Sequence, residues 1–147
     1  MDTVLGNPRV ELVRAGKGGG LVKRSPTVAD IASLGPDYHL DLPGDPLDPG
    51  CTYANDFAAL EAGGKAPAIT YAHIATETGS PGLVVQYWFF YYFNQINDLH
   101  EGDWEGMQLA FAANTPSQAL ATGPDRIALF QHGGGETVGW NDPKVQK

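Results

Sequence analysis

The segment LVVQYWFFYYF, from Leu83 to Phe93, is the longest apolar run in this chain of 147 residues. Its β-branched and aromatic residues favour an extended strand. Apolar side chains fall on both faces of such a strand, so we expect both faces to be covered. The run is interrupted by Gln86 and is shorter than the ~18 apolar residues that a membrane-spanning helix needs. It therefore predicts a core strand of a β-sheet and no transmembrane segment.

Working outward from this run, strand patterns recur along the chain, joined by short helical patterns. The predicted strands cover residues 9–14, 67–78, 103–112 and 125–133, the last being the final clear strand. The predicted helices cover residues 25–35, 55–64 and 115–123. Thr27 is the predicted N-cap of the first helix, and Thr115 is the predicted N-cap of the third. We predict the mainly-β class: one β-sandwich domain over residues 1–147, with short helices in the connections.

Two segments predict irregular loops because glycine and proline dominate them. RAGKGGGLVKR, residues 14–24, carries four glycines, and the segment 35–51 contains four prolines. We expect no regular strand or helix inside either segment.

The charge balance excludes some classes of partner. The formal net charge is −8, with 17 acidic and 9 basic residues. Nucleic-acid binding needs clustered lysine and arginine, and so does electrostatic docking on anionic lipid. An acidic chain is instead suited to binding a cation. Cys51 is the single cysteine, so the sequence offers neither an internal disulfide nor a cysteine-based zinc site.

The motif HEGDWE, residues 100–105, follows the apolar run and concentrates ionisable groups. Alternation along a strand projects Asp103 and Glu105 to the same side. Gly102 permits a bend that brings His100 back toward these carboxylates. Asp98, just upstream, could add another oxygen ligand. Carboxylate-rich sites favour hard cations, so these four residues predict a site for Ca²⁺ or Mg²⁺ before Mn²⁺.

Two other interpretations of HEGDWE remain open from spacing alone. The motif is also compatible with a strand-end polar cluster that has no ligand. Acid–base catalysis is a third interpretation, because two carboxylates at this spacing have Cα atoms ~6.5 Å apart. His132, at the end of its strand, is either part of the same site or an ordinary strand-end histidine. For Trp88 and Trp104 we expect core positions rather than a ligand platform.

The stretch LVVQYWFFYYFNQINDLHEGDWEGMQLAF, together with QHGGGETVGW, resembles the vacuolar protein sorting-associated protein 62-like family. The likeness runs from Asn7 to Trp140 and includes YHLDLPGDPLDPGCTY. It implies that the chain is an internal piece of a longer protein, incomplete at both ends. It also implies that Cys51 could pair with a cysteine outside this segment.

A more distant likeness links HEGDWE to the necrosis-inducing cytolysins, whose motif has the pattern H-x-H-D-W-E. That likeness implies a divalent cation held by His100, Asp103 and Glu105 on a β-sandwich. Gly102 replaces the second histidine, and Tyr92 stands where an upstream aspartate ligand is expected, so Asp98 or Asn94 would have to substitute.

These residues lead to two functional hypotheses. The first is a cation-binding β-sandwich module whose partners are lipid head groups or glycans, and not nucleic acid. The alternative is a metal-dependent hydrolase in which Glu105 or His132 acts as general base.

Overall fold

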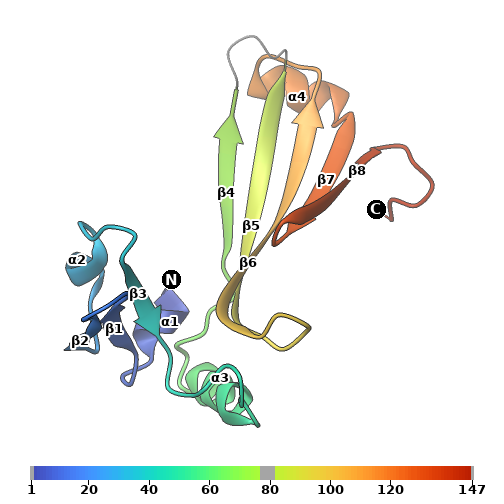
Figure 1. Cartoon of the computed structure of the whole chain (residues 1–147). Coiled ribbons are helices and arrows are strands. Elements are labelled where there is room, and N and C mark those ends of the chain that lie inside the picture. The colour runs from blue at the N-terminus through green and yellow to red at the C-terminus, as the bar shows by residue number, and fades with distance from the viewer. Residues whose placement is uncertain (1, 77–81, 147) are drawn as a thin grey trace. The chain divides into compact units, whose positions relative to one another are not determined.

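The structure is a computed structural model that describes residues 2–76 and 82–146. Its backbone divides into two compact units. The first comprises Met1–Ala68 and Tyr91–Asp103, and the second comprises Ile69–Phe90 and Trp104–Lys147. Strands β5 (Leu83–Asn94) and β6 (His100–Phe111) contribute residues to both units (Figure 1).

The first unit contains a three-stranded antiparallel sheet in the order β2–β1–β3. Its strands are β1 (Glu11–Arg14), β2 (Gly20–Arg24) and β3 (Tyr38–Asp41). The prediction of strand β1 is confirmed. The two loop predictions are wrong, because β2 lies inside residues 14–24 and β3 inside residues 35–51. Glycine and proline bend the chain between these strands, while the four or five residues of each strand satisfy their backbone groups by pairing with β1.

Three helices complete the first unit: α1 (Asp2–Gly6), α2 (Val28–Ile31) and α3 (Thr52–Ala62). The predicted capping of α2 is confirmed, since the Asp30 carboxylate accepts hydrogen bonds from the Thr27 N–H at 2.7 Å and from its hydroxyl at 2.6 Å. Lys23 also donates to Asp30 at 2.6 Å. These bonds lower the pKa of Asp30, with the Lys23 ammonium as the largest cause. The helix predicted from Asn55 begins earlier, at Thr52, and Cys51 before it is exposed.

The second unit contains a sheet in the order β4–β5–β6–β7–β8 (Figure 1). The strands not yet named are β4 (Thr70–Ala75), β7 (Arg126–Gln131) and β8 (Gly134–Gly139). Strands β4 to β7 confirm the predicted strands, although β6 begins at His100 rather than Asp103 and residues 77–78 of the first prediction lie outside the described residues. Strand β8 was not predicted, because its glycines weaken the strand pattern while its register with β7 is regular.

Helix α4 (Pro116–Thr122) packs at one end of the second sheet, as Figure 1 shows. The Thr115 hydroxyl accepts a hydrogen bond from the Gln118 N–H at 3.3 Å, which confirms the predicted cap. One buried apolar cluster joins this helix to the sheet. It contains Leu83, Ala113 and Ala119, the last from α4 itself, and Val85 and Phe111 pack against it. This cluster is the apolar core that anchors the sheet.

The mainly-β class is confirmed: the described residues form two antiparallel sheets with short helices in the connections. The prediction that both faces of the strand at residues 83–93 are covered is not confirmed. Leu83 and Tyr92 are buried, but Tyr91 is 51% exposed and the other residues of β5 are half-buried. None of the helices in the described part of the chain has the length and apolarity needed to cross a bilayer.

Candidate metal centre

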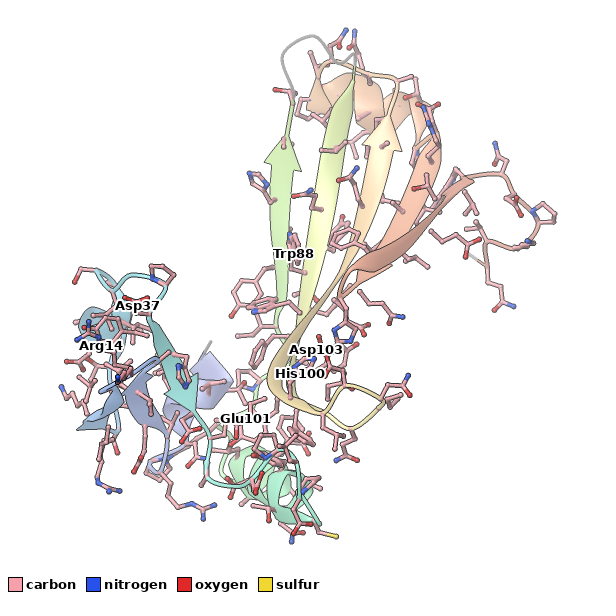
Figure 2. All side chains as sticks on the ribbon, viewed as in Figure 1. Arg14, Asp37, Trp88, His100, Glu101 and Asp103 are labelled. Atoms are coloured by element: carbon pink, nitrogen blue, oxygen red, sulfur yellow. The ribbon has the colours of Figure 1, made fainter. Side chains whose placement is uncertain are left out.

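The candidate centre lies where β6 begins, in the first unit (Figure 2). Gly102 has a φ of +65°, a left-handed conformation that favours glycine, so the predicted bend between His100 and Asp103 is confirmed. A ring nitrogen of His100 and a carboxylate oxygen of Asp103 lie within 4.8 Å of each other. Asp103 is only 7% exposed and His100 is half-buried. Two of the predicted ligands are therefore brought together.

Asn94, at the end of β5, organises the loop that leads into the centre. Its side-chain oxygen accepts from the Ile96 N–H at 2.9 Å, and its amide nitrogen donates to the Asp98 carbonyl at 3.2 Å. The same nitrogen lies 3.4 Å from His100 Nε2. Asn97 adopts a φ of +60°, which asparagine tolerates in a tight turn. One amide thus links the conformation of this loop to the position of the His100 ring.

Asp98 occupies a different environment from the one expected of a ligand. Its side chain is exposed, and its backbone carbonyl rather than its carboxylate makes the contact with Asn94. Glu105 and His132 belong to the second unit. There Glu105 pairs with Gln131, so the register places His132 one residue beyond the partner of Glu105. His132 lies in the turn after β7 with a φ of +46°, so the direction of its ring is set by this turn rather than by the sheet.

Glu101, between His100 and Gly102, is a residue that the sequence analysis missed. Its carboxylate accepts from the Leu42 N–H at 2.7 Å and from the Tyr53 hydroxyl at 2.5 Å. Burial raises the pKa of Glu101 even though both hydrogen bonds oppose the change. This side chain ties the start of β6 to the end of β3 and to α3, which fixes the backbone that carries His100 and Asp103.

Tyr53 supports Glu101 from α3. Its side chain is fully buried, and its ring stacks on Phe93 of β5 with centroids 4.0 Å apart. Burial, followed by the contact with Glu101, raises the pKa of Tyr53. Its hydroxyl therefore acts as a neutral hydrogen-bond donor over the physiological pH range.

The first unit contains a second network of polar side chains. The buried Asn7 amide donates to Asp56 Oδ2 at 3.0 Å and contacts the Tyr92 hydroxyl at 2.8 Å. Arg9 forms an ion pair with Asp56. These contacts join α1, α3 and β5, so Tyr92 serves a structural network at the position where the likeness to cytolysins placed an aspartate ligand.

The sequence contained no signal for the partners of these networks, since Glu101 lies 59 residues from Leu42 and 48 from Tyr53. Comparisons with protein-family models, with curated proteins and with solved structures gave no match for this chain.

Proposed function

We propose that this protein is a divalent-cation-binding β module and that His100 and Asp103 are the central ligands. The carrying observation is the buried Asp103 carboxylate beside the half-buried His100 ring. Within the described residues, no lysine or arginine forms an ion pair with Asp103. Removing a carboxylate from water is unfavourable without a compensating positive charge, which a bound cation would supply. Calcium and magnesium fit this oxygen-containing ligand set better than manganese.

The remaining ligands are proposed from the sequence pattern. Asp98 is exposed and close in sequence, so an ion could draw its carboxylate in. Glu105 stays a predicted ligand because strand alternation favours the same side as Asp103.

The proposed role of the ion is to order the loop of residues 95–99. Asn94 connects this loop to His100, and Ile96 within it is 72% exposed. An exposed apolar side chain beside a bound cation is suited to an interface in which the ion contacts an anionic or hydroxyl group of the partner. Lipid head groups or glycans are the partner classes we propose for this loop.

Calorimetric titration of EDTA-treated protein with Ca²⁺, Mg²⁺ and Mn²⁺ tests the cation site. We expect saturable binding of Ca²⁺ or Mg²⁺ in the wild type and its loss in Asp103→Asn, with Glu105→Gln weakening it about tenfold if Glu105 is a ligand. Asp48→Asn is the matched control, because Asp48 is exposed in a loop of the same unit.

Three outcomes distinguish the possible roles of the centre. Equal binding by the wild type and Asp103→Asn would place the ion elsewhere. No heat from any of the three ions in a folded sample would mean that His100 and Asp103 form only an imidazole–carboxylate contact. Vesicle and glycan binding that EDTA does not affect would contradict the proposed role of the ion in partner recognition.

A further inference from the structure

The second sheet has two chemically different faces. The Gln86 side chain donates to Gln108 at 2.9 Å, so these residues of β5 and β6 share one face. Alternation then places Val85 and Met107 on the other face, with Ile74 and Leu129 as their paired neighbours. That other face carries the core under α4 and also includes Tyr87 and Phe89. The first, which we call the aromatic face, consists of Tyr71, His73, Gln86, Trp88, Phe90, Trp104, Gln108 and Phe130.

The rings of the aromatic face contact one another in two groups. Trp104 lies against Tyr71 and Phe90, with ring centroids 5.4 and 5.1 Å away, and Trp88 meets Phe130 at 5.1 Å. Figure 2 labels Trp88 on β5. These edge-to-face and tilted contacts are favourable between aromatic rings, and they hold each group in a fixed arrangement.

Glycines on both sides allow the Phe130 ring to lie against the sheet. Gly106 and Gly135 are the residues paired with Phe130 on β6 and β8. A Cβ atom added to Gly106 would lie 2.2 Å from the Phe130 ring, so the ring occupies the space above that glycine. Because neither glycine has a side chain, the Phe130 ring covers this part of the sheet surface.

A row of neutral polar groups runs beside these rings. His73 Nδ1 lies 3.3 Å from the Gln86 carbonyl oxygen, and Gln86 donates in turn to Gln108. A carboxamide has two N–H donors and a carbonyl that accepts two bonds. The contacts within the row use only part of that capacity, so the row can still bind the hydroxyl groups of a ligand.

Exposure and charge indicate the class of ligand. Trp104 is 41% exposed and His73 is exposed, so the face is open, contrary to the core position expected for Trp104. None of these eight residues is Asp, Glu, Lys or Arg, and the charged residue that alternation places on the same side, Arg126, lies farther along β7. Exposed aromatic groups on a sheet surface are typical of binding sites, and the absence of charge matches a neutral partner. Polyhydroxylated rings offer both an apolar C–H face for the aromatic side chains and hydroxyls for the amides.

We propose that the aromatic face binds a neutral oligosaccharide, at a site separate from the candidate metal centre. The face crosses β4 to β7, about 14 Å at the usual strand spacing, which suits several sugar rings rather than one. Binding at this face requires no ion, because its eight residues offer hydrogen-bond donors, acceptors and rings and no carboxylate.

Calorimetry of the full chain in EDTA, with cellohexaose, xylohexaose, mannohexaose and laminarihexaose, tests this proposal. We expect at least one to bind saturably. Trp104→Ala, which removes an exposed ring, is expected to weaken that binding about tenfold, and Gln108→Leu to weaken it by a similar factor. Leu129→Ala is the matched control, because Leu129 is 55% exposed on the opposite face of the same sheet.

Three results would overturn the proposal. One is the absence of binding by all four oligosaccharides to a folded wild type. Another is binding that needs Ca²⁺ and is lost in Asp103→Asn but kept in Trp104→Ala, which would assign the sugar to the metal centre. The third is binding to phosphatidylcholine vesicles, lost in Trp104→Ala, without binding of any oligosaccharide, which would make the face a membrane contact.

Discussion

The two units of this chain are stabilised in different ways. The first holds 12 acidic and 6 basic residues, and side-chain networks centred on Glu101 and Asp56 connect its elements. The second holds 5 acidic and 3 basic residues, and a five-stranded backbone ladder with an aromatic face connects its strands. Charge and buried polar groups suit ion chemistry, whereas a near-neutral sheet suits neutral ligands. The comparison teaches that two units of one short chain can be stabilised by different kinds of interaction.

The distribution of tryptophan makes this difference measurable. All three tryptophans, Trp88, Trp104 and Trp140, belong to the second unit, whereas the 11-residue helix α3 belongs to the first. Tryptophan fluorescence therefore reports mainly on the second unit, and circular dichroism at 222 nm reports strongly on α3.

The largest expected effect comes from Tyr53→Ala. It removes a fully buried ring that stacks on Phe93 and donates to Glu101, so we expect the free energy of unfolding to fall by about 3–5 kcal/mol. Urea unfolding followed at 222 nm should show the loss, while the tryptophan midpoint moves less. Tyr53→Phe, which keeps the ring, should cost about 1–3 kcal/mol because Glu101 Oε1 loses its donor. Equal shifts in both signals would contradict the division into two units.

The second-largest effect is expected from Gly106→Val, which perturbs the second unit instead of the first. The new side chain would collide with the Phe130 ring and displace it from Trp88, at a cost of about 1–3 kcal/mol. Here the tryptophan midpoint should fall while the 222 nm transition moves less. Gly134→Val is the control, because an added Cβ there meets no side chain within 4 Å. A variant that unfolds like the wild type would show that the Phe130 ring does not depend on Gly106.

The smallest effect concerns pH and the first unit alone. Asp30 has a lowered pKa, so its ionised form is favoured by folding and stabilises the protein above the unfolded pKa of ~3.9. This contribution should be lost as the pH falls through the folded pKa. Unfolding midpoints of wild type and Asp30→Asn should differ slightly near pH 6 and converge toward pH 2. A gap that widens with acid would show that Asp30 is protonated more readily in the folded chain.

The sequence allowed good prediction where local chemistry is sufficient. The β-branched and aromatic runs identified β4 to β7, and Thr115 with Pro116 identified α4. It failed at β2, β3 and β8, because glycine or proline in or near these strands weakens the local strand pattern and the strands form through pairing with another strand. The juxtaposition of His100 and Asp103 followed from Gly102, since its bend is local. Glu101 was missed because its donors, Leu42 and Tyr53, reach it only through the tertiary fold.

The outer position of β4 has a consequence for handling the protein. Strand β4 pairs with β5 on one side and ends the order of the second sheet, and its sequence TYAHIA contains no charged residue, glycine or proline. Such a strand has none of the features that keep sheet edges from joining one another. Concentrated samples are therefore prone to aggregate by adding strand to strand, and a lysine at exposed Ala72 would be the first change to make a solution that stays monodisperse.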